Sequence, residues 1–199
     1  MSSLNKPKLI IIAGPNGSGK TTITEQGLGH EWFNGCTYIN PDNIAQDELG
    51  DWNNASNSLE AAKRATTLRY DLLAKGKSIA FETVFSSEEK IHFIKQAKQQ
   101  GYFIRLFFIC TDSPMINASR IALRVMEGGH EVPISKIISR YQKSIINAYQ
   151  SNNIVDRLYL YDNSVDDQSP QLMARFSDGE LIKRYPCAQP SWTEIFLQH

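Results

Sequence analysis

The chain has 199 residues, of which 41% are hydrophobic and 21% are charged, as in an ordinary globular protein. This composition excludes a disordered, collagenous or coiled-coil chain. Lysine plus arginine and aspartate plus glutamate number 21 each, so the basic excess of a dedicated nucleic-acid-binding protein is missing, although a local basic groove is compatible with this balance. We therefore expect a single domain over residues 1–199 that binds no nucleic acid.

The three cysteines, Cys36, Cys110 and Cys187, are odd in number and widely spaced. They predict neither a disulfide framework nor a CxxC metal or redox site. Cys110 lies in an apolar run and is expected in the core. The apolar stretch at residues 9–13 is too short for a signal peptide or a membrane span, so a cytoplasmic protein without membrane contact is expected.

Short apolar segments alternate with longer amphipathic ones, which predicts an α/β fold around a mainly parallel sheet. Five apolar segments are expected to form its buried strands: residues 8–13, 37–40, 78–81, 102–110 and 157–161. Two further segments, 172–176 and 180–185, flank Asp178-Gly179, which is a hairpin signal. They predict an antiparallel hairpin over about residues 172–185 at the edge of the sheet.

Helices are predicted between these strands from apolar spacing and from capping signals. Ser86 followed by Glu89 has the pattern of a capping box, so a helix is expected to open there and to end before Gly101. Three other helices are expected over these segments: residues 58–75, 114 to about 127, and 133 to about 150.

The strongest motif follows the first strand and fits GxxxxGK[ST] at every fixed position: Gly14-Pro15-Asn16-Gly17-Ser18-Gly19-Lys20-Thr21. Glycines let the backbone wrap closely, so that its N–H groups and the N-terminus of the next helix face phosphate oxygens. Lys20 is expected to reach the β- and γ-phosphates and the Thr21 hydroxyl to ligate Mg²⁺, while Thr22 completes the nucleotide-binding segment. The alternative is a glycine-rich turn without a ligand.

Other marks narrow the class of nucleotide-using protein. The sequence contains no NKxD base-specificity motif of GTPases and no apolar strand that ends in the Asp-Glu pair typical of ATPases. A P-loop combined with acidic residues at strand ends and an arginine-bearing flap favours phosphoryl transfer to a hydroxyl group.

Two acidic segments are expected on the edge of the sheet where open α/β folds bind ligands. Asp42, in Asn40-Pro41-Asp42, could accept the proton of an acceptor hydroxyl, or it could be the N-cap of a helix that runs to Leu49. Glu82 and Thr83 end the third strand and could contact a polar substrate. Glu82 alone could equally be an ion-pair partner.

A flap is predicted over about residues 118–140, where four cationic side chains surround a polar break between two helices: Arg120, Arg124, His130 and Arg140. A desolvated arginine stabilises the charge that spreads over the oxygens of a transferred phosphoryl group. Each of the four, taken alone, could also be a solvated charge on a helix face.

The succession GPNGSGKTT, YINPD, FETVFSS, RVMEGGHEVP and SRYQKS, followed by YDNS, resembles the zeta toxin family of P-loop kinases over about residues 9–164. The resemblance implies a P-loop NTPase-type three-layer αβα fold like that of the nucleotide and shikimate kinases. It also implies ATP- and Mg²⁺-dependent phosphorylation of a UDP-N-acetylated amino sugar, such as UDP-N-acetylglucosamine. A cognate antitoxin protein is then a possible partner, but the sequence does not separate a toxin from a housekeeping kinase.

The matching motifs carry the family's functional residues onto this chain. Lys20 and Thr21 match the P-loop lysine and the metal-ligating hydroxyl, and Asp42 matches the catalytic base. Glu82 and Thr83 match the pair whose surroundings hold the amino-sugar nucleotide.

The flap matches the family less completely. Arg124 resembles a flap arginine that stabilises the transferred phosphate. His130 stands where plasmid-type members have a second arginine, and a histidine is only partly charged near neutral pH. Arg140 or Arg120 is expected to supply the missing charge, or transfer is slower.

Three other functions stay open: a kinase for another small hydroxyl compound, an ATP-binding interaction module, and a polynucleotide end kinase, which the neutral charge balance disfavours. Asp162-Asn163-Ser164, after the last parallel strand, could lie near the nucleotide base. Trp32, Trp52 and Trp192 are expected to be packing residues, although contact of Trp32 or Trp52 with a substrate stays open.

Overall fold

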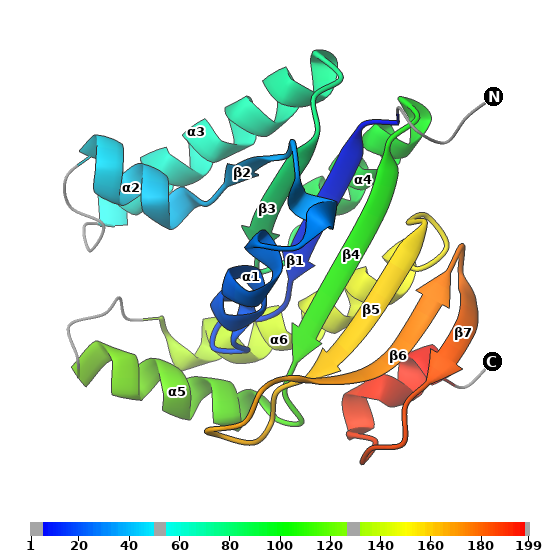
Figure 1. The fold of residues 1–199 in the computed structure, drawn as a ribbon. Helices are drawn as coiled ribbons and strands as arrows, with labels where there is room; N and C mark the ends of the chain where they lie inside the picture. Colours follow the sequence, from blue (N-terminus) through cyan, green and yellow to red (C-terminus); the bar gives the residue numbers. More distant parts are fainter. Residues whose placement is uncertain (1–5, 50–54, 127–131, 198–199) are drawn as a thin grey trace.

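The computed structural model describes residues 6–49, 55–126 and 132–197 (Figure 1). In these residues seven strands form one sheet: β1 (Lys8–Ala13), β2 (Thr37–Ile39), β3 (Ile79–Thr83), β4 (Phe103–Cys110), β5 (Arg157–Asp162), β6 (Gln171–Ser177) and β7 (Glu180–Arg184). The predicted strands are all present, and their ends differ from the predicted ones by no more than two residues.

The strands follow the order β2-β3-β1-β4-β5-β6-β7 across the sheet. The first five pair in parallel, whereas β6 runs antiparallel to β5 and β7 antiparallel to β6. The α/β class, the parallel sheet of five strands and the antiparallel C-terminal hairpin are therefore confirmed.

Helices cover the two faces of this sheet. They are α1 (Lys20–Leu28), α2 (Pro41–Leu49), α3 (Ala55–Ala74), α4 (Glu88–Gln99), α5 (Pro114–Met126), α6 (Ile134–Ser151) and α7 (Glu194–Leu197), with short 3₁₀ turns η2 (Glu31–Phe33) and η3 (Ser191–Thr193). No helix in the described ranges is both long enough and apolar enough to cross a bilayer.

The core consists of one apolar cluster on each face of the sheet. The larger cluster packs side chains of α3, α4, α6 and α7 against the sheet, and it includes the buried Cys110 and Trp192, as predicted. The smaller cluster packs α1 and η2 against the other face. Figure 1 shows α1 in front of the sheet beside β1, with α4 and α6 behind the sheet, which is the three-layer arrangement expected of a P-loop NTPase.

Strand β1 fixes the position of the P-loop. Its residues Leu9–Ala13 are fully buried, because β1 is paired on both edges and covered on both faces. A continuous apolar run is typical of such a central parallel strand. The chain leaves β1 at the carboxyl edge of the sheet, where the P-loop leads directly into α1.

The predicted capping box at Ser86 is wrong. Helix α4 begins at Glu88 with Ser87 as its N-cap, and the Ser87 side chain makes no capping hydrogen bond. The reason lies in α6, whose Ser144 hydroxyl donates to the Val84 carbonyl at 2.5 Å and whose Asn147 amide donates to the Phe85 carbonyl at 2.8 Å. These bonds fix the chain before α4 independently of a cap.

Candidate functional site

The P-loop lies at the carboxyl end of β1, between β3 and β4, where parallel α/β sheets form ligand crevices. Gly17 and Gly19 have φ angles of 78° and 85°, which residues other than glycine rarely adopt. A Cβ atom on Gly19 would lie 2.1 Å from the Asn163 amide nitrogen. The loop therefore needs glycine for its conformation and for its close packing.

Lys20 and Ser18 give the P-loop the character of an anion site. Lys20 Nζ donates to the carbonyls of Gly14 and Pro15, both at 3.0 Å, so its ammonium lies over the loop. Burial lowers the pKa of Lys20 to about 8, although the nearby carboxylates of Glu82 and Asp42 raise it. The buried Ser18 hydroxyl has no hydrogen-bond partner among the described residues. A phosphate group would compensate both side chains.

A polar cavity of about 480 Å³ opens beside the P-loop and is called the polar cavity below. Its walls come from the P-loop, the start of α2, the end of β3 and helices α3 to α6. It brings together these predicted site residues: Asn16, Gly17, Lys20, Thr21, Asp42, Glu82, Thr83, Arg124 and Arg140. This size lies within the range of small-molecule sites, about 300–1,000 Å³.

Asp42 lies on the polar cavity with its carboxylate exposed at the start of α2. The N-cap alternative for Asp42 is wrong, because the Asn40 side chain occupies that role. Asn40 Oδ1 accepts from the Asp42 backbone N–H at 2.9 Å. The Asp42 carboxylate is therefore left available to a ligand.

Tyr38 orients Glu82 and was missed by the sequence analysis. Its hydroxyl donates to Glu82 Oε1 at 2.7 Å, and Asn40 Nδ2 donates to the Tyr38 hydroxyl at 3.3 Å. Burial and the bond to Glu82 raise the pKa of Tyr38, so the phenol stays protonated and remains a donor. The signal was in the register: Tyr38 pairs with Ala80, two residues before Glu82 on the same face of β3.

The wall of the polar cavity after β3 is formed by a hydrogen-bonded turn. Thr83 Oγ1 accepts from the Phe85 N–H at 3.2 Å, and Phe85 has a φ of 63°, which is rare for a residue other than glycine. Strand β3 extends to Thr83, beyond its predicted end at Phe81, because Glu82 and Thr83 pair with Ile12 and Ala13 of β1. Both predicted substrate-contact residues are thus anchored on the sheet.

The predicted flap cations separate into two positions. Arg140 Nη1 donates to the P-loop side chain Asn16 at 3.2 Å, and Arg124 lies on the polar cavity close enough to Lys20 to lower its pKa. Arg120 instead pairs with Asp166 at 2.6 Å and donates to the Asn163 carbonyl at 2.8 Å. His130 and Trp52 lie outside the described residues.

A second, smaller cavity of about 240 Å³ lies on the other side of the P-loop, between Gly19, Arg120 and the chain after β5. Asn163 Nδ2 donates to the Ser18 carbonyl at 2.9 Å, which ties this chain segment to the P-loop. Asn163 therefore lies beside the P-loop, whereas its place near a nucleotide base stays a prediction.

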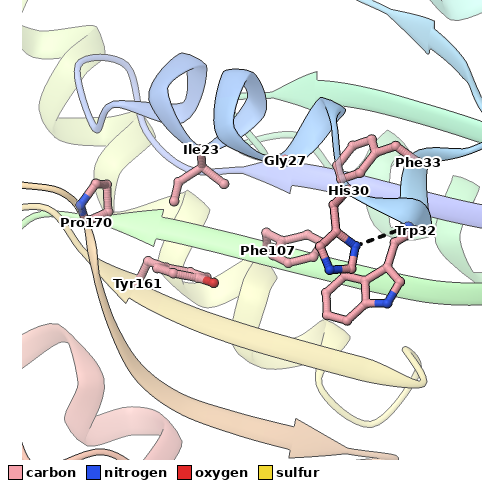
Figure 2. Close-up of a pocket in the computed structure, with 8 residues that line it drawn as sticks. All are labelled: Ile23, Gly27, His30, Trp32, Phe33, Phe107, Tyr161 and Pro170. Carbon is pink, nitrogen blue, oxygen red and sulfur yellow. Dashed lines mark hydrogen bonds between the residues drawn. The ribbon is translucent and has the colours of Figure 1, made fainter.

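An apolar cavity of about 210 Å³ lies on the face of the sheet covered by α1 and η2 (Figure 2). Figure 2 shows Ile23 of α1 above it and Phe107 and Tyr161 of the sheet below, with His30 beside Trp32. Its lining contains no carboxylate and no P-loop residue, so it offers no group for phosphoryl transfer. Trp32 packs here, 6.1 Å from Phe107 between ring centroids.

Comparison with known sequences finds a family model and a relative. A family model described as Zeta toxin matches residues 1–166. An uncharacterised protein of Haemophilus influenzae is 28% identical over 137 residues, which cover 67% of this chain and 92% of that protein.

Solved structures share the fold. The AvrRxo1-ORF1:-ORF2 structure with ATP matches with a TM-score of 0.65 and 20% identity, over 97% of this chain and 63% of the other. The PezAT chromosomal toxin-antitoxin system of Streptococcus pneumoniae matches with a TM-score of 0.62 and 18% identity, over all of this chain and 81% of the other. This chain thus spans less than two thirds of the AvrRxo1 chain that it resembles.

Proposed function

The chain belongs to the zeta toxin family, and from this premise we propose that it transfers a phosphoryl group from ATP, with Mg²⁺, to a hydroxyl group of a small acceptor. The family and the fold support a phosphotransferase. The observation that carries the proposal is the convergence of the P-loop lysine, Asp42 and Glu82 on one polar cavity. Two alternatives are a glycine-rich turn without a ligand and a module that only binds ATP. Neither gives a reason for Asp42 and Glu82 to lie on the same cavity as Lys20.

The residues present fit a nucleotide. The glycine conformations, the unpartnered Ser18 hydroxyl and the buried Lys20 ammonium form a cradle suited to phosphate oxygens. Thr21, in the first turn of α1 and on the polar cavity, would hold Mg²⁺ through its hydroxyl. Bound ATP with Mg²⁺ supplies the phosphoryl group and a positive charge next to it. The smaller cavity beside Asn163 and Arg120 would take the nucleoside.

Asp42 would act as the general base. Its carboxylate is exposed to the polar cavity and takes no part in capping α2, so it can accept the proton of an acceptor hydroxyl and orient the oxygen. Glu82, held by the Tyr38 hydroxyl, would bind a second polar group of the acceptor. Two carboxylates at the ends of neighbouring strands thus position the acceptor from one side.

Arg124 and Arg140 would stabilise the transferred group. Arg140 reaches the P-loop through Asn16, and Arg124 faces the same cavity from α5. Because a guanidinium stays charged at neutral pH, this pair can compensate negative charge that spreads over phosphoryl oxygens. Arg140 is therefore our candidate for the family's second flap cation, and Arg120 serves the nucleoside side instead.

The acceptor we propose first is UDP-N-acetylglucosamine, the acceptor class implied by the family resemblance. The test is transfer from labelled ATP to this sugar nucleotide by the wild type and by the variants Lys20→Ala, Asp42→Asn and Asp47→Asn. Asp47 is a matched control, because it is an exposed carboxylate on the same helix outside the polar cavity. Asp42→Asn should lower kcat by about 10²–10⁴-fold, the usual contribution of a positioned base.

Each outcome decides one part. If the wild type and Asp47→Asn form labelled product and the other two variants do not, the result supports the reaction, the base and the acceptor together. Transfer by Asp42→Asn at the wild-type rate would show that Asp42 is not the general base. ATP binding without transfer would discard this acceptor, and another small hydroxyl compound would be tried next. Absence of ATP binding would reject the kinase itself.

We also propose a protein antitoxin as partner, because the PezAT neighbour is described as a toxin-antitoxin system. Expression of the wild-type chain should then arrest growth, and Lys20→Ala should relieve the arrest. Normal growth in the presence of soluble wild-type protein would contradict a toxin role and leave the kinase proposal intact.

A further inference from the structure

One face of the sheet has no part in the proposed transfer. Along β4, Arg105 is half-buried between the fully buried Ile104 and Leu106, so its side chain points to the opposite face from theirs. Figure 1 shows α4 and α6 behind the sheet but, among the residues that the structure describes, no helix in front of β5, β6 and β7. The front side of β4, β5, β6 and β7, to which Arg105 points, is called the open face below.

Four cations lie on the open face, one on each strand: Arg105, Arg157, Arg175 and Lys183. The register places Arg105 beside Arg157 and Arg175 beside Lys183. Because neighbouring strands are only about 4.7–4.9 Å apart, each pair sets two positive charges side by side, which is destabilising. Within the described residues only Arg157 of the four has a carboxylate partner, Asp178 at 3.4 Å. The open face therefore carries positive charge that an anion would compensate.

Aromatic rings alternate with these cations. Three of the guanidinium groups lie over rings, with each Cζ atom 4.6–5.6 Å from a ring centroid. Attraction to the rings at these distances holds the guanidinium groups against the sheet. Rings and guanidinium planes are both surfaces on which nucleobases stack. The pairs are Arg105 over Trp32 and Phe103, Arg157 over Phe103, and Arg175 over Tyr159.

Arg105 adds a separate observation. Its Nε atom is buried and has no hydrogen-bond partner among the described residues. A buried donor without a partner costs free energy, unless a ligand satisfies the group. The adjacent Arg157 raises that cost, because it brings a second positive charge instead of an acceptor. A phosphate between the two guanidinium groups would compensate both.

We propose that the open face binds a short segment of single-stranded nucleic acid, with its phosphates on the four cations and its bases on the rings between them. The three strand spacings from β4 to β7 span about 14–15 Å. Four-stranded sheets that bind RNA by stacking hold two or three bases, so a segment of that length is expected here. The rings favour this ligand over a polyphosphate, which has no bases to stack.

This inference goes beyond the proposed function, because phosphoryl transfer at the P-loop needs neither the open face nor a nucleic acid. The overall charge balance of 21 to 21 predicted no nucleic-acid ligand. A balanced total does not exclude a local excess of positive charge, and the sheet register brings such an excess together from segments that are far apart in the sequence.

The first experiment measures the salt dependence of binding. A labelled RNA of about eight adenylates, within the site sizes of single-strand-binding folds, is titrated with the protein by fluorescence anisotropy at a series of KCl concentrations. The variants are Arg105→Gln and Arg175→Gln, and the control is Arg184→Gln. Arg184 is exposed on β7, but it pairs with the buried Ala174 and so lies on the opposite face from Lys183.

The wild type should bind with a Kd of about 10⁻⁴–10⁻⁶ M, and log K should fall with log salt with a slope of about −3, since each contacted phosphate of a single strand contributes about −0.7. Each open-face variant should bind more weakly with a slope shallower by about 0.7. Arg184→Gln should keep the wild-type slope. Absence of binding, or an equal change of slope in Arg184→Gln, would overturn the proposal. Arg175→Gln keeps the test decisive if Arg105→Gln does not fold.

The second experiment tests the stacking. Phe103→Leu should weaken RNA binding about tenfold and leave the salt slope unchanged, because stacking on a ring is not electrostatic. Phe103→Tyr keeps a ring and should bind as the wild type does. Linear polyphosphate should bind equally to all three proteins. RNA binding that is unchanged in Phe103→Leu, or no tighter than that of polyphosphate, would overturn the assignment to a nucleic acid.

Competition with ATP separates the open face from the P-loop. RNA binding should be the same with and without saturating ATP and Mg²⁺. Displacement of the RNA by ATP would place it at the P-loop and would overturn this inference while the kinase proposal stands. RNA binding with the expected slopes by a protein that neither binds ATP nor transfers phosphate would support the open face although the proposed function fails.

Discussion

Tyr38 links the two acidic groups of the polar cavity through a short chain of hydrogen bonds. Its hydroxyl donates to Glu82 and accepts from Asn40, and Asn40 in turn accepts from the backbone of Asp42. One phenol thus couples the orientation of the Glu82 carboxylate to the start of α2, the helix that carries Asp42, our proposed base. A hydroxyl in this position acts on geometry rather than on the transferred group.

Tyr38→Phe should lower kcat/KM for the acceptor by about tenfold, because Glu82 loses its donor and turns toward solvent. The Km for ATP and the thermal midpoint should change little, since the ring still packs. The control is Tyr161→Phe, which alters a tyrosine that packs against the same core cluster as Tyr38 but lines the apolar cavity. An equal loss in both variants would mean that the effect is structural.

We expect Lys20 to make nucleotide binding depend on pH. Its pKa in the free protein is about 8, below the usual 10.5, because burial disfavours the charged form. Phosphate groups restore the charge, so binding near pH 8.5 should take up a proton, whereas binding near pH 6.5 should not. The lowered pKa also affects folding stability. Between about pH 8 and pH 10.5 Lys20 binds more protons in the unfolded chain than in the folded one, so its contribution to the free energy of unfolding rises with pH.

The measurement is calorimetry of ATP-analogue binding in buffers of different ionisation enthalpy, with Lys20→Arg as the comparison. An arginine stays protonated throughout this range. The variant should therefore bind without proton uptake at either pH. Proton uptake of the same size in Lys20→Arg would assign the titration to another group.

At the scale of elements, α6 is the support of the site. It carries Arg140 toward the P-loop, and its Ser144 and Asn147 hold the backbone of the turn after β3. Its apolar stripe predicted a helix that packs on the sheet, and that prediction is confirmed. The polar positions within the stripe gave no signal of their partners, because those partners lie about sixty residues away in the sequence.

Asn147→Ala should destabilise the fold by about 1–3 kcal/mol, because the Phe85 carbonyl loses a buried donor. The KM for the acceptor should rise as well, since the turn after β3 forms part of the cavity wall. Denaturant unfolding and acceptor kinetics measure the two effects. Gln142→Ala, an exposed change on the same helix, should leave both unchanged.

The sequence predicted the elements better than their contacts. The P-loop, the strand ends and the hairpin each follow from local patterns, such as glycine spacing and short apolar runs. The capping box at Ser86 failed because bonds from α6 determine where α4 begins. Arg69 was read only as part of an amphipathic helix, since its burial depends on the packing of α3 against the sheet and α4.

At the scale of the whole molecule, the family match covers a shorter part of the chain than the fold does. The match ends at residue 166, and every candidate site residue lies before it. Yet β6 is an inner strand of the sheet, and Phe176, Trp192 and Phe196 are buried in the larger core cluster. Trp192 Nε1 also donates to Asp162 Oδ1 at 3.3 Å, next to the Asn163 that contacts the P-loop. The last segment therefore supports the site without forming part of it.

A chain that ends at residue 166 should consequently fail to fold, although it retains the entire family match. It exposes the edge of β5 and one side of the core, and loss of a single buried aromatic such as Trp192 already costs about 3–5 kcal/mol. That is a large part of the stability of a typical domain, about 5–15 kcal/mol. Circular dichroism on heating should show no cooperative transition for the truncated chain, and Trp192→Ala in the full chain should keep a transition at a lower temperature. A cooperative transition in the truncated chain would show that residues 1–166 fold independently and that the C-terminal hairpin is an addition to a complete kinase fold.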